Sequence, residues 1–524
     1  MTISRRVSTW LLAALPIALA VLVYRPWRLL PFDMWDFADF LPVISHLHGA
    51  MSQYGALLHY YAQDGRMNAV FYLTFVAQFT AFGFHSGDWQ LLRFVVMAFD
   101  LCLLFAVMRK MGVRPVAAAG ALGLLAMASP ALRAWLQLMA EPMALAALLA
   151  GVWVALDFGV TPHWRRSVAV IMALVACTFL SKEVDGALGL MVLLVAVFWP
   201  QPGRERAPLF SRRNVALALG VALVAAGEAV LLLIVRAQPH ATGYGMAYGS
   251  APLSLAALGS NLIAMLMPVR PAGGAAIGLA YPANVLAILV VVLALLAAVR
   301  EQRDRRSLVI KVALGLLPAV LGALIYWPWP DFHPFYALPF FVGPIFLYAG
   351  ALDVLLKGSR FQRSLAILAA VVAPLYAAIP ASRSTEIAAA SLRLNANFAV
   401  LLPHFHDGDT LVVLDPVDAS RALPVEPPLL RKYAVSLGLF DDTTHAPLLR
   451  AVACDAYGPG SSAAVPAAIV SYSYGCGQIR HATVHVIAPY VWRDWLTLAR
   501  VDDTLSLDFA GPLVADRLLG QRVH

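Results

Sequence analysis

The sequence predicts a mainly α-helical, polytopic membrane protein of about eleven spanning helices, with a small C-terminal α/β domain. Composition is the first observation: 61% of the 524 residues are hydrophobic and 13% are charged, whereas a soluble protein carries about 25% charged residues. The second observation is order, since long apolar runs alternate with short polar loops. A chain with so few charges cannot cover its apolar surface in water, so a lipid bilayer is its expected surroundings.

The positions of the apolar runs set the predicted spans, because a helix needs about 20 mostly apolar residues to cross a bilayer. The predicted spans are 8–24, 90–108, 115–131, 138–157, 167–181, 186–200, 214–235, 281–299, 308–327, 335–352 and 364–380. The first span follows a basic N-terminus, as a signal peptide does. No small-x-small cleavage site follows it, so we expect an uncleaved span.

The basic residues predict the orientation of the spans, because cytoplasmic loops are rich in Lys and Arg. Whether a further apolar stretch, 69–84, crosses the membrane determines which basic loops lie on the same side. If it does not cross, all basic clusters fall on one side, and if it crosses, the cluster at Arg5 and Arg6 falls opposite to the others. We therefore expect 69–84 to lie at the outer membrane face, with the N-terminus cytoplasmic and the C-terminal domain periplasmic in a bacterial inner membrane.

The net charge of +8 does not indicate a nucleic-acid-binding protein. The Lys and Arg residues fall in short clusters between apolar runs, which is a signal of membrane topology. Membrane lipids are therefore expected partners, and nucleic acid is not.

A change in composition near residue 381 predicts two domains. Residues 1–380 form a membrane module, with juxtamembrane helices in the outer loop 25–89. Residues 381–524 carry short apolar runs separated by Pro, Gly and Asp, a pattern typical of strands. The expected strands include 410–414, 467–472 and 482–488. The C-terminal domain is therefore predicted to be mixed α/β and extracytoplasmic.

The four cysteines divide between these two parts. Cys102 and Cys177 lie in apolar runs, where cysteine packs as a small hydrophobic residue. Cys454 and Cys476 lie in the C-terminal part, where an oxidising compartment would allow a disulfide between them. A pair of free buried thiols is equally compatible with the sequence.

Three aspartates follow the first span among aromatic residues, in the stretch PFDMWDFADF. The spacing of Asp33, Asp36 and Asp39 places them on one side of a helix. This pattern fits an interfacial helix whose carboxylates face a water-filled cavity. It also fits an ordinary amphipathic helix whose aspartates are merely solvated.

Other polar residues lie at the same predicted membrane face. Charged residues at or inside a span are costly and tend to mark function. Glu141 opens an apolar span, although a Glu also stabilises a helix N-terminus by its charge alone. The further candidates on this face are Arg66, Lys182, Arg270, His333 and Tyr336. Carboxylates can act as general bases, and cations can hold a phosphate leaving group, so this set suits a phosphate-linked substrate.

The order of these residues resembles the GT-C superfamily of integral-membrane glycosyltransferases, over roughly residues 8–352. WDFADF is similar to the acidic motif of the first outer loop, with Asp36 as the best match. Gly87 or Gly83, followed by Arg93, is similar to the glycine and arginine that lead to the second span. The remaining matches are Glu141 at the fourth span, Lys182 after the fifth, and the stretch His333, Tyr336, Leu338 and Pro339.

The resemblance implies transfer of a sugar from a polyprenyl-phosphate carrier to a glycan, lipid or protein on the outer face. By analogy Asp36 would be the base or a metal ligand, with Glu141 assisting, and Asp33 and Asp39 as alternatives to Asp36. Lys182 and His333 would bind the carrier phosphate. A Mg or Mn ion held by Asp36 and Glu141 would suit carboxylate oxygens, since some members use a divalent ion and others do not.

Two other classes of function remain open from the residues alone. A transporter or flippase would carry ionisable residues near mid-span, and Glu228 is one such residue. No repeated half of the sequence supports that class. A scaffold with an outer sensory domain would leave the gathering of polar residues at one face unexplained.

Overall fold

The computed structural model describes most of the membrane module and five strands of the C-terminal part. The described residues are 2–24, 40–41, 43–63, 65–83, 86–136, 140–199, 208–237, 253–269, 281–300, 305–327, 334–401, 410–415, 448–453, 468–471, 482–487 and 502–507.

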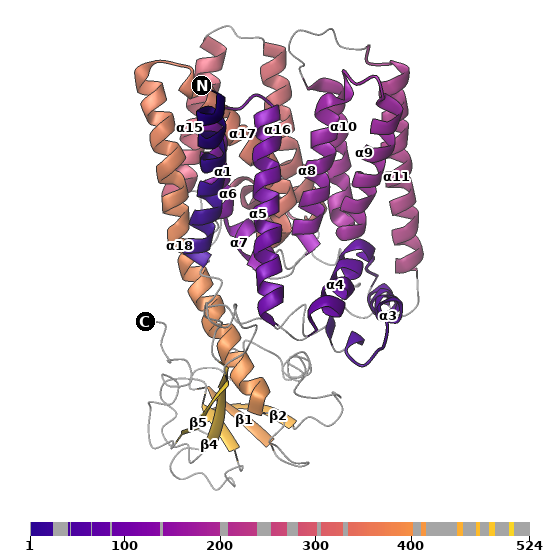
Figure 1. Cartoon of the computed structure of the whole chain (residues 1–524), viewed down its shortest axis with the longest axis vertical. Helices are drawn as coiled ribbons and strands as arrows, with labels where there is room; N and C mark the ends of the chain where they lie inside the picture. The colour runs from indigo at the N-terminus through magenta and orange to yellow at the C-terminus, as the bar shows by residue number, and fades with distance from the viewer. Residues whose placement is uncertain are drawn as a thin grey trace. The chain divides into compact units, whose positions relative to one another are not determined.

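Helices dominate this described part up to residue 401 (Figure 1). The earlier ones are α1 (Thr2–Tyr24), α3 (Ala50–Ala62), α4 (Ala69–Phe82), α5 (Ser86–Lys110), α6 (Pro115–Ala126), α7 (Ser129–Leu136), α8 (Ala140–Phe158), α9 (Trp164–Ser181), the 3₁₀ helix η2 (Glu183–Leu188) and α10 (Gly189–Phe198). The later ones are α11 (Arg212–Arg236), α13 (Leu255–Leu266), α15 (Pro282–Arg300), α16 (Arg305–Ile325), the 3₁₀ helix η3 (Pro334–Ala337), α17 (Leu338–Leu356) and α18 (Arg360–Leu401).

Among the residues described, seven helices are long and apolar enough to cross a membrane: α5, α8, α9, α11, α15, α17 and α18. A polytopic α-helical membrane protein, the class predicted from composition, is therefore what the structure shows. Shorter apolar helices occupy the predicted spans 8–24, 115–131 and 308–327. That these shorter helices also cross the membrane, which would bring the total to about eleven spans, remains a prediction.

Two segments differ from regular spans. The predicted span 186–200 begins in η2 and continues as α10, whose 10 residues extend only about 15 Å. Helix α4 has 14 residues and is about 21 Å long, below the about 30 Å of a hydrocarbon core. The placement of 69–84 at the outer membrane face stays a prediction, because α6 and α10, which lie in predicted spans, are shorter still.

The chain divides into two compact units, of which the first contains residues 1–24, 58–74 and 93–383. Its centre is α17, which packs against α6, α8, α15 and α16. The span that contains α17 is 78% buried, whereas that of α11 is 17% buried. Helix α17 therefore lies inside the bundle, and α11 presents most of its apolar surface outward.

Small residues allow the central helices to pack closely, as is common between membrane helices. A Cβ at Gly343 of α17 would lie 2.5 Å from the carbonyl oxygen of Gly315 in α16. A Cβ at Gly120 of α6 would lie 2.5 Å from the Cβ of Ala370 in α18. Glycine at these positions therefore lets the backbones approach to a distance that no side chain would permit.

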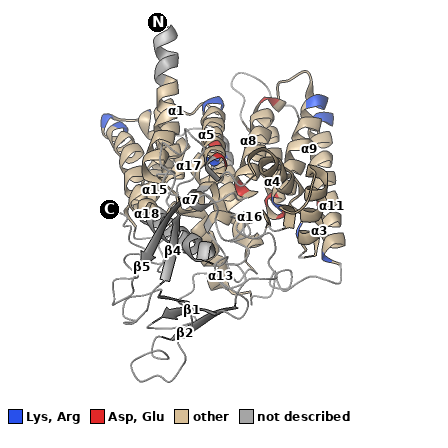
Figure 2. Cartoon of the chain, turned by 60° about the horizontal axis from the view of Figure 1, so that its bottom comes forward, with Lys and Arg blue, Asp and Glu red and all other residues tan. Residues whose placement is uncertain are grey.

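Basic residues mark one end of the helices of the first unit, at the upper helix ends in Figure 2. Lys110, after which α5 ends, forms an ion pair of 2.6 Å with Asp157 near the end of α8. Arg213, near the start of α11, donates to the carbonyl of Gly159 at 2.6 Å. These contacts place the ends of three helices at one face, which we call the basic end.

The second unit contains residues 25–57, 75–92 and 384–524. Its strands are β1 (Thr410–Asp415), β2 (Leu448–Ala453), β3 (Ala468–Ser471), β4 (Ala482–Ile487) and β5 (Asp502–Leu507). Strand β1 pairs in parallel with β2 and β3, and β4 pairs with β5 in antiparallel fashion. Strands β1, β3 and β4 fall on the three apolar runs predicted as strands. Helix α18 continues to Leu401, beyond the change in composition near 381.

Candidate functional site

A buried ion pair joins two of the predicted site residues in the first unit. Glu141 lies in the first turn of α8, and Lys182 follows the last residue of α9. The Nζ atom of Lys182 is 3.1 Å from Oε1 of Glu141, with the two side chains 11% and 1% exposed. Neither Glu141 oxygen has a hydrogen-bond partner among the described residues. Both oxygens therefore remain able to accept a proton or a hydrogen bond.

The end of α9 is shaped by its own sequence. The amide of Lys182 donates to the carbonyl of Thr178 at 3.1 Å, and Lys182 then adopts an extended conformation. The amide of Asp185 donates to the carbonyl of Lys182 at 2.9 Å, which starts the 3₁₀ turn. A Cβ at Gly189 would lie 2.7 Å from Cγ1 of Val175, so glycine lets the chain fold back along α9.

Aromatic rings form one wall beside the ion pair. The Nζ atom of Lys182 lies 4.7 Å from the ring centroid of Tyr336, a cation–π contact. The ring of Tyr336 stacks on Tyr326, with centroids 5.3 Å apart and planes within 5°. The amide of Asn261 donates to the carbonyl of Tyr326 at 2.9 Å. Asn261 of α13, Tyr326 directly after α16 and Tyr336 of η3 thus hold this wall in place.

Arg66 brings a second cation toward Lys182. The amide of Arg66 donates to the carbonyl of Tyr61 at 2.9 Å, after a turn at Gly65 with φ +74°. Burial lowers the pKa of Lys182, but the Glu141 carboxylate, together with Tyr336 and Glu183, raises it more. The pKa of Lys182 is therefore held well above its ordinary value, and the positive charge of Arg66 opposes this shift.

Asp185 and Glu183 lie close enough to the pair to interact with its charges, and a third carboxylate, Glu228, borders η2. Asp185 is fully buried, and neither of its oxygens has a hydrogen-bond partner in the described part. Burial raises the pKa of Asp185 well above its usual value, with Glu141 and Glu183 adding to the shift and Lys182 opposing it. A Cβ at Gly186 would lie 2.7 Å from Oε2 of Glu228, so Glu228 of α11 borders η2. Asp185 is thus suited to donate a hydrogen bond.

These groups gather at helix ends away from the basic end. Helix α8 runs from Glu141 to Asp157, and α9 runs from Arg165 and Arg166 to Lys182. Helix α17 runs from the Tyr336 side to Lys357. The charges of the candidate site are therefore separated from those of the basic end by the length of α8, α9 and α17. This length is about 27 Å for the 18 residues of α9.

The predicted site residues fall into two groups. The structure brings Glu141, Lys182, Tyr336 and Arg66 together, and it buries Arg93 in α5 at 4% exposure. The other predicted residues lie outside the described part: Asp33, Asp36, Asp39, Arg270, His333, Cys454 and Cys476.

Two buried carboxylates were missed from the sequence as candidates. Asp185 shares the stretch SKEVDG with Lys182, and spacing alone does not tell a buried residue from one in a solvated turn. Asp100 of α5 is 1% exposed, and its Oδ2 accepts a 2.8 Å hydrogen bond from Nε1 of Trp135. A single Asp inside the apolar stretch VVMAFDLCLLF was a signal that could have found it.

The described residues do not form a metal centre by themselves, because no group of three or more His, Cys, Asp or Glu side chains among them could hold an ion. Glu141 is engaged by Lys182. A Mg or Mn ion shared by Glu141 and Asp36 therefore stays a prediction, with Asp36 outside the described residues.

Comparison with known proteins gave no identification. No protein-family model, no curated protein and no solved structure matches this chain.

Proposed function

We propose that the protein is a glycosyltransferase that moves a sugar from a polyprenyl-phosphate carrier to a glycan, lipid or protein on the outer face of the membrane. The observation that carries the proposal is the buried Glu141–Lys182 pair at helix ends away from the basic end. A buried charge pair seldom stabilises a fold better than apolar residues would, so its presence favours a functional role.

The chemistry follows from the charges of the pair and its neighbours. The acceptor oxygen attacks the anomeric carbon of the sugar, and the bond from that carbon to the phosphate oxygen breaks. A carboxylate takes the acceptor proton, a role given to Asp36 with Glu141 assisting. Lys182 and Arg66 hold the negative charge of the departing polyprenyl phosphate, with His333 as a further partner.

The basic end supports an orientation for this chemistry. If the positive-inside rule holds, the basic end faces the cytoplasm of a bacterial inner membrane, and the Glu141–Lys182 pair faces the periplasm. A carrier lipid would then reach the pair from the outer leaflet. The residues from 381 onward would form a periplasmic mixed α/β domain within reach of the acceptor.

The test follows radiolabelled sugar from a polyprenyl-phosphate donor to acceptor or water. We expect purified wild-type protein to release polyprenyl phosphate, and Asp36→Asn and Glu141→Gln to lose most of that activity. If both variants transfer or hydrolyse sugar as fast as the wild type, the assignment of the site is wrong.

Asp100 favours a second candidate, a transporter or flippase of a lipid-linked or small substrate. It lies buried within the span of α5, and ionisable residues inside spans are common in transport proteins. The donor assay separates the two functions, because a flippase moves the intact donor across a vesicle membrane and leaves the sugar–phosphate bond unbroken. Translocation that depends on Asp100, without bond cleavage, would favour this second candidate.

A further inference from the structure

A separate pocket lies in the first unit toward the basic end. It is a cavity of about 210 Å³ bordered by α8, α10, α15, α16, α17 and the turn after α5. Its walls are mainly apolar and include Val195, Leu295 and Phe346. An apolar lining of this kind favours a hydrocarbon chain over a polar metabolite.

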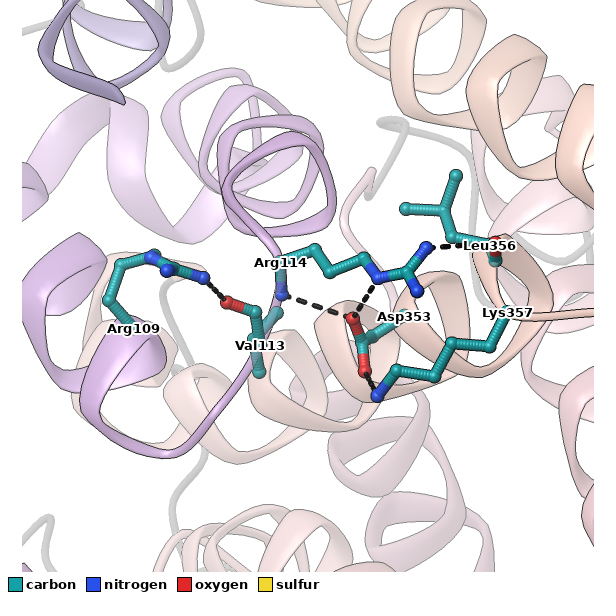
Figure 3. A network of polar contacts seen from close by, with 6 residues as sticks. All are labelled: Arg109, Val113, Arg114, Asp353, Leu356 and Lys357. Carbon is teal, nitrogen blue, oxygen red and sulfur yellow. Dashed lines mark hydrogen bonds and ion pairs between the residues drawn. The ribbon is translucent and has the colours of Figure 1, made fainter. Parts of the chain in front are cut away.

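The charges around this pocket are mostly positive. Its charged lining residues in the described part are Lys311, Lys357 and Asp353. Asp353 already forms an ion pair with Lys357 and accepts a 3.0 Å hydrogen bond from the backbone amide of Arg114 (Figure 3). The guanidinium Nε of Arg114 lies 3.8 Å from the same carboxylate. Lys357 and Arg114 therefore both face the Asp353 carboxylate, and Lys311 adds a further basic side chain to the pocket wall.

An aromatic ring borders the same pocket. Trp199 follows α10, and Nζ of Lys311 lies 5.9 Å from its ring centroid. Trp beside a basic side chain is typical of the level at which lipid head groups meet the hydrocarbon core. The pocket thus combines an apolar interior with a cationic and aromatic border, as a lipid tail and its head group require.

We propose that this pocket binds an anionic membrane phospholipid, with an acyl chain in the apolar cavity and its phosphate beside Lys311 and Lys357. Basic pockets between membrane helices at the cytoplasmic side recognise lipid head groups in this way. The polyprenyl-phosphate donor is a different lipid, expected near Lys182. The phospholipid site is independent of the proposed glycosyltransferase function.

Glycine 350 offers a way to fill the pocket without touching its charges. Gly350 lines the pocket in α17, and a Cβ added there meets no atom within 4 Å. The variant Gly350→Leu should therefore place its side chain in the cavity. A matched control is Gly227→Leu in α11, where a Cβ also meets nothing within 4 Å and which does not line the pocket.

The test incubates the detergent-purified protein with equal amounts of phosphatidylglycerol and phosphatidylcholine and counts bound lipids by native mass spectrometry. Wild type and Gly227→Leu should retain phosphatidylglycerol preferentially. Lys311→Gln and Lys357→Gln should each weaken this binding about five-fold, and Gly350→Leu should retain neither lipid at this site.

Three results would overturn the proposal. They are equal retention of both lipids by the wild type, unchanged binding in Lys311→Gln, and displacement of phosphatidylglycerol by an equal concentration of polyprenyl phosphate. Thermal unfolding of each variant shows whether it is folded. If Gly350→Leu unfolds, Lys311→Gln decides, because Lys311 is exposed and its substitution leaves the packing of α16 intact.

Discussion

At the scale of single residues, the pairing of Glu141 with Lys182 determines what the candidate site can do. Both side chains are removed from water, so each depends on the other for compensation of its charge. Neither oxygen of the Glu141 carboxyl group, and neither oxygen of Asp185, has a hydrogen-bond partner among the residues described. Glu141 can therefore accept a hydrogen bond from a hydroxyl group of the proposed substrate, and Asp185, whose pKa burial raises, can donate one.

The energetic coupling of this pair is testable by a double-mutant cycle. Glu141→Gln and Lys182→Met each leave one buried charge without its partner, so each should destabilise the protein by about 3–5 kcal/mol. The double variant should lose clearly less free energy of unfolding than the sum of the losses of the two single variants. Chemical unfolding in detergent measures these free energies, and additive losses would show that the two side chains do not interact.

The raised pKa of Asp185 predicts a pH dependence of stability. The folded chain binds this proton more tightly than the unfolded chain, whose Asp has a pKa near 3.8. The stability that Asp185 contributes is complete below about pH 4 and is lost as pH rises through the folded-state pKa.

Asp185→Asn cannot ionise, so its stability relative to the wild type should increase from pH 4 to 9, by at most about 1.4 kcal/mol per pH unit. Thermal unfolding of both proteins across this range measures the difference. A difference that stays constant with pH would mean that the pKa of Asp185 is not raised in the folded protein.

The sequence allowed candidate site residues to be identified where a charged side chain lies at the end of an apolar span. Glu141 and Lys182 stood out because charges at span ends are costly. That they pair with each other depends on how α8 packs against α9, and hydropathy carries no information on helix pairing. Asp185 was missed because its burial comes from the 3₁₀ turn of η2, which periodicity does not reveal.

At the scale of elements, the apolar runs predicted helix positions well because each helix must satisfy its backbone hydrogen bonds internally in lipid. The break before α10 was not predicted, because the residues of η2 and α10 form one continuous apolar run apart from Asp185 and its neighbours. The close contact of α16 with α17 was also not predicted, since it depends on which glycines face each other across the interface.

A pair of glycines in α17 tests this packing. Gly343→Ala should destabilise the protein by about 1–3 kcal/mol, because the added Cβ meets the carbonyl of Gly315. Gly350→Ala in the same helix adds its Cβ to open space and should be neutral or stabilising by up to about 1 kcal/mol. If the two variants show equal midpoints of thermal unfolding, α16 and α17 do not pack through Gly343.

At the scale of the whole molecule, the distribution of charge along the helices supports one orientation. The basic end collects Lys and Arg residues that the positive-inside rule would assign to the cytoplasm. The Glu141–Lys182 pair lies at the other ends of α8 and α9. The sequence predicted this separation from loop charges alone. It did not predict the proposed phospholipid pocket, whose lining comes from five helices and a turn.

Cysteine labelling tests the orientation in cells. In a variant without the four native cysteines, His163→Cys lies at the basic end and Ser52→Cys lies in α3, and both positions are exposed. A membrane-impermeant maleimide added to the periplasm should label Ser52→Cys and leave His163→Cys unlabelled until the membrane is opened. Labelling of His163→Cys alone would reverse the proposed orientation.

The two carboxylates at opposite ends of α8 provide the most direct test of the proposed glycosyltransferase. In reconstituted vesicles with a radiolabelled polyprenyl-phosphate sugar, Glu141→Gln should lower the rate of sugar release by about 10²-fold or more. Asp157→Asn, at the basic end of the same helix, should keep the wild-type rate. Equal rates for Glu141→Gln, Asp157→Asn and the wild type would contradict the claim that the Glu141–Lys182 pair is the site of sugar transfer.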